Sequence, residues 1–372
     1  MASNYESATG ANNSPSVSKH DICIQQAGID FGIAHCLDGT THWFRDDYSR
    51  SLRAAVKTTA QIFNGRRMVF SDHEQDDLTS RLKLCRSLPS PDREDVPVID
   101  VLLRTLLPSH FSQLVSSIAD RGEMGMFNRE LFEQVCHEGA RTQAVARAIQ
   151  WQCKSSADGM RVKHAVETAF SSDESVLAYK VALLRRPFVP ADKAAAYALH
   201  ERAKGNELLF QQEMSGEKVH RQPDTLHRPS IALIQEDLHA LQNGLDRAES
   251  IKARFRGGVI TVNFSRVHGL YLGAVLLADG RTSADLASEV DRLWDEVTDG
   301  DGHVHQRREP QCSWAGLIEP HDTARKDALL LELECRALRE KYVRAKGSEV
   351  LPTFTLIQPA SAGVQSQENR HA

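Results

Sequence analysis

The chain has 372 residues, of which 41% are hydrophobic and 26% are charged, a composition typical of a globular protein with room for two domains. Its formal net charge of −5 excludes a general attraction to nucleic acid, so such contact would need a local basic patch. Seven cysteines without a CxxC pair and no signal peptide predict a reducing cytoplasm, and since no apolar run is long enough to span a bilayer we expect no membrane partner.

The first half of the chain has mostly helical patterns. Residues 1–20 and the tail 359–372 are polar and rich in small residues, and we expect both to be disordered. Ile22–Asp38 fits either a hairpin or a pair of short strands. Helical spacing then recurs in the segments Asp46–Phe63, Glu74–Ser87, Val98–Leu107, Phe111–Ala119 and Asn128–Cys153. These patterns predict a mainly α-helical N-terminal domain over residues 21–155, ending at the polar break Lys154–Gly159.

The second half, residues 160–358, has a clearer order of elements. Apolar or alternating segments typical of strands are Ser175–Arg185, Gly257–Ser265, Gly269–Ala278 and Ser313–Glu319. Helical spacing marks Ser230–Arg254, Thr282–Thr298 and Thr323–Arg344. The order is β-α-β-β-α-β plus a trailing helix, which predicts an α+β fold of the split βαβ (ferredoxin-like or RRM-like) kind. We expect four antiparallel strands with helices on one face, and a hairpin between Gly257–Ser265 and Gly269–Ala278.

Five segments of this half are similar, in the family's order, to replication initiators of filamentous phages (inoviruses) and their prophage relatives of the YagK/YfjJ type. These initiators are rolling-circle HUH endonucleases. The segments are Val166–Leu183, Gly269–Gly280, Leu293–Gly302, Gly316–Leu330 and Lys341–Phe354. The resemblance covers about half of the chain and implies a protein of DNA replication encoded by a prophage or mobile element.

The resemblance also implies that the active site is degenerate. In the family, two histidines on one strand hold a divalent metal against the scissile phosphate, and a tyrosine on the final helix attacks it. The matching positions here are Tyr271 and Gly273 for the histidines, Asn263 for an upstream acidic residue, and Cys335 for the tyrosine. None of the first three ligates a hard metal as histidine and carboxylate do, so the resemblance implies no cofactor and no catalytic residue.

The final helix presents one more pattern. Leu331, Cys335, Leu338 and Tyr342 form a stripe that we expect to lie on the sheet, which makes Cys335 a buried and inert thiol. Tyr342 is the fallback nucleophile if a nicking site survives in rearranged form, with His303 and His305 as displaced ligands for Mg or Mn. The group His303, His305, Cys312 and His321 fits no common structural-zinc spacing, and a polar loop is the favoured interpretation.

Several cations of the second half are candidates for contact with a DNA backbone. They are Arg254, Arg256, Arg266, Arg307, Arg308, Lys341 and Arg344. Many carboxylates lie near them in the sequence, so we expect any binding to single- or double-stranded DNA to be weak.

The sequence leaves three hypotheses open. The favoured one is a catalytically degenerate relative of rolling-circle initiators that keeps a DNA-binding or partner-binding role. The second is an active metal-dependent enzyme that nicks single-stranded DNA at a rearranged site. The third is a protein-interaction or regulatory adaptor that does not bind DNA.

Overall fold

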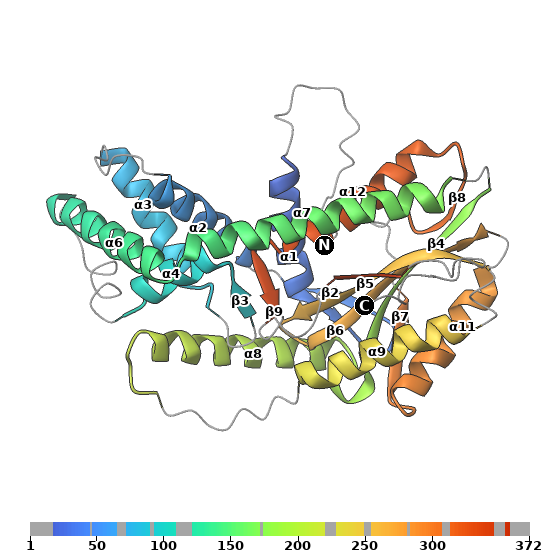
Figure 1. Ribbon diagram of the computed structural model, residues 1–372. Coiled ribbons are helices and arrows are strands. Elements are labelled where there is room, and N and C mark those ends of the chain that lie inside the picture. Colours follow the sequence, from blue (N-terminus) through green and yellow to red (C-terminus); the bar gives the residue numbers. More distant parts are fainter. Residues whose placement is uncertain are drawn as a thin grey trace, which may run out of the picture.

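The computed structural model describes residues 18–44, 47–64, 72–89, 93–108, 121–171, 174–219, 228–248, 254–280, 283–306, 313–345 and 354–357. They form helices and antiparallel sheets, which confirms the α+β class. In Figure 1 a group of helices lies at one end, a sheet with its own helices lies at the other, and the long helix α7 runs along both. No helix among these residues combines the length and apolar character needed to cross a bilayer.

The N-terminal helices share one buried apolar core. They are α1 (Lys19–Gly32), α2 (Tyr48–Phe63), α3 (Asp72–Cys85), α4 (Pro97–Leu106) and α6 (Arg121–Arg141). Leu52, Leu82, Leu102 and Phe132 are among the fully buried side chains of this core. A short antiparallel pair, β3 (Arg93–Asp95) with β9 (Val343–Ala345), ties this region to the end of the chain.

The prediction of a hairpin or a pair of short strands over Ile22–Asp38 is wrong for most of this segment, which is helical up to Gly32. Ser18 accepts a hydrogen bond from the Asp21 amide at 3.2 Å, which caps α1. The buried residues Ile24, Ala27 and Phe31 then recur at helical spacing. Only the last part is extended, as β1 (Ile33–His35), which pairs with β2 (Thr41–Trp43).

The polar break expected at Lys154–Gly159 lies inside α7 (Ala144–Ala169), a single helix of 26 residues. Ala144 belongs to the helical core, while Val162 and Val166 belong to a core under the sheet. Ser155, Asp158 and Gly159 are on the buried side of the helix. Gly159 faces Leu338, whose Cδ2 would lie 3.7 Å from a Cβ at this position. The small and polar residues are therefore a packing surface, and the helix continues through the expected boundary.

The sheet has six antiparallel strands, two more than expected. They are β4 (Val176–Arg185), β5 (Phe255–Ser265), β6 (Gly269–Asp279), β7 (Gly302–Gln306), β8 (Gly316–Ile318) and β10 (Phe354–Ile357). Their order is β10-β5-β6-β4-β7, and β8 also pairs with β4. The hairpin between β5 and β6 is confirmed, with Asn263 opposite Tyr271 and Thr261 opposite Gly273. The polar loop expected around His303 is wrong, because Gly302–Gln306 pairs with β4.

Helices cover both faces of the sheet, whereas the sequence predicted one covered face. Helices α9 (Ile231–Arg247) and α11 (Ser283–Val297) pack on one face. Helices α7 and α12 (Thr323–Arg339) pack on the other. Strands β4 and β6 are buried along nearly their whole length, so both of their faces need a cover. A further helix, α8 (Lys193–Met214), follows a 3₁₀ turn at Arg186–Phe188 and was not predicted.

The continuity of α7 can be tested at Ala157, which is exposed between the two cores. Ala157→Pro removes an amide donor and clashes with the preceding turn, so it should lower the free energy of unfolding by about 3 kcal/mol or more. The control Ala157→Gly should cost only about 1 kcal/mol. Urea unfolding followed by circular dichroism measures both. Ready proteolytic cleavage of the wild type within residues 154–159 would contradict a continuous helix.

Candidate functional site

The sheet face under α7 and α12 changes from apolar to polar along the strands. Residues directly opposite each other on paired strands share a face. The row that contains Val275 and Val259 is apolar on β5 and β6 and continues on β4 as Lys180, the next contains Gly273 and Thr261, and the next contains Tyr271 and Asn263. On the far side of β4 these two rows continue onto β7. His305 continues the Gly273 row through Ala182, and His303 continues the Tyr271 row through Leu184. The three strand positions singled out by the family resemblance, Asn263, Tyr271 and Gly273, therefore lie together at one end of this face.

Gly273 has no space for a side chain. A Cβ there would lie 2.2 Å from Asn263 Nδ2 and 3.2 Å from Thr261 Oγ1. Asn263 is buried, and its Oδ1 accepts a hydrogen bond from Thr261 at 3.2 Å. A histidine at this position would require Asn263 to move away from its partners.

A buried ion network lies beside these rows and is centred on Glu332 of α12. Its carboxylate accepts hydrogen bonds from Lys180 of β4 at 2.5 Å, from Arg336 at 2.9 Å and from the Trp314 indole at 2.7 Å. The Lys180 and Arg336 side chains are only 6% and 5% exposed. Burial alone would raise the pKa of Glu332, but the charges of Lys180 and Arg336 and their hydrogen bonds lower it to about 2. Glu332 is therefore ionised and fully committed to protein partners.

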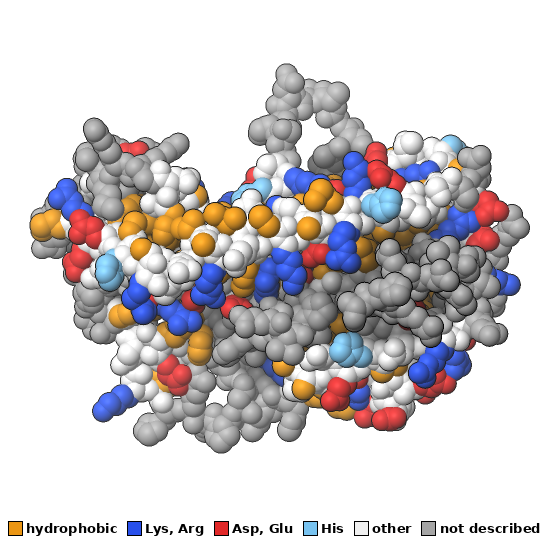
Figure 2. Space-filling view, viewed as in Figure 1, with side chains coloured by type: hydrophobic (Ala, Val, Ile, Leu, Met, Phe, Trp, Pro, Cys, Tyr) orange, Lys and Arg blue, Asp and Glu red, His pale blue; other side chains and the backbone are white. Residues whose placement is uncertain are grey.

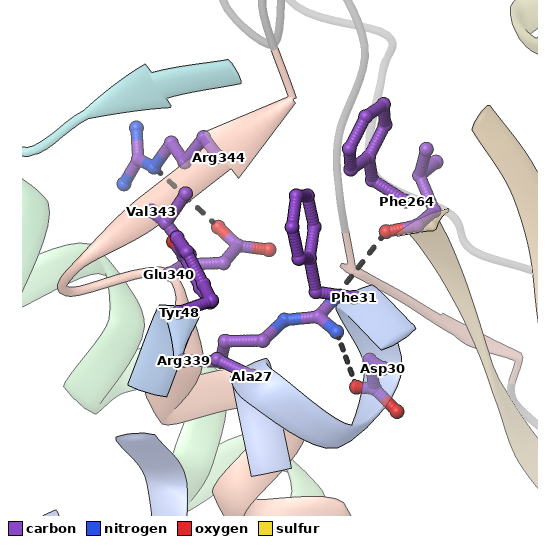
Figure 3. Close-up of a pocket in the computed structure, with 10 residues that line it drawn as sticks. Ala27, Asp30, Phe31, Tyr48, Phe264, Arg339, Glu340, Val343 and Arg344 are labelled. Carbon is purple, nitrogen blue, oxygen red and sulfur yellow. Dashed lines mark hydrogen bonds and ion pairs between the residues drawn. The ribbon is translucent and has the colours of Figure 1, made fainter. Parts of the chain in front are cut away.

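The next turn of α12 connects this network to helix α1. Arg339 donates to Asp30 at 2.6 Å, and its other nitrogen lies 3.4 Å from both Val262 O and Asn263 Oδ1. Figure 3 shows Arg339 reaching between Asp30 and the backbone of β5. The adjoining cavity measures about 40 Å³, which suits a few water molecules and no larger ligand. Helix α1 therefore closes this end of the site.

Three buried histidines close the side next to Tyr271. They are His35 of β1, His268 of the β5–β6 turn and His305 of β7. The His35 ring centroid lies 4.5 Å from that of His305 and 5.7 Å from that of His268. His268 Nε2 accepts a hydrogen bond from the His35 amide at 2.8 Å, while its Nδ1 lies 3.3 Å from Phe188 O, so the proton belongs on Nδ1. Burial lowers the pKa of His268 to about 4.

These histidines are arranged for packing. Within the described part of the chain, no three His, Cys, Asp or Glu side chains are grouped so as to hold a metal ion. His303 and His305 share one side of β7 with ring centroids 6.1 Å apart, and His305 Nε2 is 2.7 Å from Thr41 Oγ1. His321 lies on the exposed turn before α12, and Cys312 is outside the described residues.

Cys335 does not point into the polar rows. Its thiol contacts Cys23 of α1, and the hydrogen bond with Cys23 together with burial raises the pKa of Cys335. The prediction that the stripe containing Leu331 and Cys335 lies on the sheet is therefore wrong. The α12 residues that pack there are Leu329, Leu333 and Ala337, while Leu331 is 39% exposed. The thiol is buried, as expected.

Tyr342, the fallback nucleophile, lies in another place. Its hydroxyl contacts His20 Nδ1, and burial raises its pKa to about 12. It lines a cavity bounded by α1, α2, α4 and α7. His303 and His305 are on β7, which pairs with β4, whereas the residues around Tyr342 come from the N-terminal helices and α7.

The cations predicted to contact DNA are not gathered in one described patch. Arg266 is 7% exposed, donates to Glu207 at 2.7 Å and lies over the Phe31 ring. Arg256 is paired with Glu174.

Of the remaining predicted cations, Arg344 stacks on Trp151 at 3.8 Å beside Glu340. Arg254 is exposed and Lys341 is half-buried, at separate places in the fold, and Arg307 and Arg308 lie outside the described residues. Arg266 and Arg344 are thus held in the interior, and the surface role of the others stays a prediction.

A row of cations on α7 was missed by the sequence reasoning. Arg147, Lys154 and Arg161 are exposed and recur every seven residues, so they share one side of the helix. Figure 2 shows Lys and Arg side chains along one edge of α7 and hydrophobic side chains along the other. Their spacing of seven residues could have predicted this row. It was not recognised because a domain boundary was expected at Lys154–Gly159, in the middle of the row.

Comparison with known proteins finds no match to a family model, to a curated protein or to a solved structure. A functional proposal therefore rests on the sequence and the geometry of the chain itself.

The lack of space at Gly273 can be measured. Gly273→Ala should lower the free energy of unfolding by about 1 to 3 kcal/mol, because its Cβ overlaps Asn263. In a double-mutant cycle, Asn263→Ala should recover part of that loss, with a coupling of about 1 kcal/mol or more. Additive effects of the two substitutions would contradict the contact. Gly273→His should be less stable still than Gly273→Ala.

The buried His268 predicts a dependence of stability on pH. The unfolded imidazole takes up a proton near pH 6.5 and the folded one only near pH 4, so the unfolded state binds more protons in this window. Stability should therefore be unaffected above pH 6.5 and fall by about 3 kcal/mol as the pH drops to 4. Below about pH 4.5 the Glu332 carboxyl of the unfolded chain takes up a proton that the folded carboxyl takes up only near pH 2, so stability should fall further. In His268→Gln the loss between pH 6.5 and 4 should shrink, and an unchanged profile would contradict this assignment.

Proposed function

We propose that this chain is a catalytically inactive relative of filamentous-phage replication initiators, encoded by a prophage or mobile element, that acts by binding DNA weakly. The observation that carries the proposal is the ion network around Glu332, which lies directly beside the polar rows that contain the family positions Asn263, Tyr271 and Gly273. A scissile phosphate bound at these rows would need positive charges such as those of Lys180 and Arg336. Here Glu332 neutralises the cations internally.

A split βαβ arrangement is part of this proposal. The strands β4, β5, β6 and β7 follow in the chain with α9 after β4 and α11 after β6, and their order in the sheet is β5-β6-β4-β7. All neighbouring pairs are antiparallel. This is the arrangement expected of ferredoxin-like and RRM-like sheets. Strands β8 and β10 and the second helical layer would then be additions.

Loss of catalysis is supported by burial as well as by residue type. Asn263, Tyr271 and His305 are each 4% exposed. Helix α1 and the β1–β2 hairpin lie across the polar rows through Asp30 and His35. A DNA strand therefore has no access to this end of the sheet in the folded chain.

The proposed DNA contact is the cation row on α7. Arg147 and Arg161 are separated by about 21 Å along the helix at 1.5 Å per residue. The row is exposed, and Arg161 donates a hydrogen bond to Asp158 at 3.0 Å. Three phosphate contacts give a slope of log affinity against log salt of about −2 to −3. Weak, sequence-indifferent binding follows from so few contacts on an acidic chain.

A reducing cytoplasm is the proposed compartment. The six cysteines within the described residues are free thiols. A reducing compartment would maintain thiols in this state.

An adaptor that binds a protein and no DNA is the second candidate. The other edge of α7 favours it, since Val145, Ile149 and Met160 are 43%, 54% and 69% exposed. Such exposed apolar side chains on one helix are typical of contact surfaces.

A salt titration separates these candidates. Fluorescence anisotropy with single- and double-stranded oligonucleotides should give weak binding with the slope stated above. Replacing Arg147, Lys154 and Arg161 with Gln should flatten the slope by about 2 units or more, uniformly across sequences. The matched double variant Arg254→Gln/Arg256→Gln should change it less, because the paired Arg256 side chain is only 17% exposed whereas that of Arg161 is 61% exposed. No binding at low salt would reject the DNA role and favour the adaptor.

The same samples test for nicking. Incubation with Mg or Mn and single-stranded DNA should yield no covalent protein–DNA adduct. An adduct that disappears in Tyr342→Phe would contradict the inactive site and support a rearranged nuclease.

A further inference from the structure

A cavity of about 530 Å³ lies between α1, α2, α4, α7 and the end of α12, away from the sheet. Its volume falls within the usual range for sites that bind small molecules. Most of the lining is aliphatic or aromatic. The side chains Val56, Phe63, Val98, Ile99, Ala148 and Leu338 provide this surface.

One end of the cavity is polar and positively charged. Lys19, His20, Lys341 and Tyr342 line it, and no Asp or Glu belongs to the lining. Lys19 is already paired with Glu334, and His20 contacts the Tyr342 hydroxyl. The Lys341 ammonium has no hydrogen bond or ion pair with any described residue. An ammonium at the mouth of an apolar cavity is stabilised by a ligand anion.

We propose that this cavity binds an amphiphilic monocarboxylate with an unbranched hydrocarbon chain, such as a medium-chain fatty acid. The chain would lie along α2, α4 and α7. The carboxylate would meet Lys341 beside the Tyr342 hydroxyl. A cationic amphiphile is disfavoured by the Lys341 ammonium, and a neutral one would leave Lys341 without a counter-ion.

The site is independent of the DNA role proposed above. It uses none of Arg147, Lys154 and Arg161, and none of the residues around Glu332. Its lining residues on α7 are Val145, Ala148 and Gln152, which are on a different side of the helix from the cation row.

The test uses the full chain and displacement of 11-(dansylamino)undecanoic acid, below the micelle concentration of each competitor. Each added methylene should improve affinity about fourfold, so octanoate, decanoate and dodecanoate should differ by about fifteenfold per step. Decanoate should bind at least tenfold more tightly than decanol or decyltrimethylammonium. Lys341→Ala should remove that preference without changing decanol affinity by more than twofold, and Lys341→Arg should keep it.

A second pair of variants tests where the hydrocarbon lies. Ala60 is exposed and lines the cavity, so Ala60→Trp should fill it and weaken decanoate at least tenfold while the chain stays folded. Ala146→Trp, on the exposed side of α7 outside the cavity, should have no effect. The proposal is overturned if no competitor displaces the probe saturably, if decanol and decanoate bind equally, or if the two Trp variants behave alike.

Discussion

The bond between Glu332 and Lys180 fixes how the last helix sits on the sheet, and much of the structure depends on that orientation. Two charges taken out of water gain little net energy, yet removing one of them leaves the other unpaired at a cost of about 3 to 5 kcal/mol. Such a pair penalises other alignments of α12. With Glu332 and Arg336 turned to the sheet, Cys335 must face α1 and Arg339 must reach Asp30. The buried carboxylate of Glu332 thus determines how the sheet, α12 and α1 contact one another.

The same arrangement explains why the polar end of the sheet is charged without being open. Lys180, Arg336 and Arg339 are the kinds of side chain that hold phosphate, but Glu332 and Asp30 take up their hydrogen bonds. On the other side of Tyr271 the histidines pack through ring contacts and through one hydrogen bond, from the His35 backbone amide to His268. Polar residues here satisfy one another, as buried polar groups must.

Sequence reasoning was accurate where the signal was local. The β5–β6 hairpin follows from two alternating segments and a short turn, and its register brings Gly273 beside Asn263. It failed for His303 and His305, because a polar strand at a sheet edge lacks the apolar alternation that marks buried strands. It also missed Glu332 and Lys180, which are 152 residues apart. A lone charged residue on a helix predicts solvent exposure, and only the tertiary fold shows that it is buried with a partner.

Opening the polar rows to a DNA strand would require α1 and the β1–β2 hairpin to leave. That movement breaks the Arg339–Asp30 pair and the bond from the His35 amide to His268. Separating the ion pair costs about 3 to 5 kcal/mol, and breaking the hydrogen bond from the His35 amide costs about 1 kcal/mol more. An open form is therefore populated at no more than roughly one part in a thousand. A ligand that depended on this form would lose about a thousandfold in apparent affinity. The exposed row on α7 carries no such penalty, which is why the proposed DNA contact is placed there.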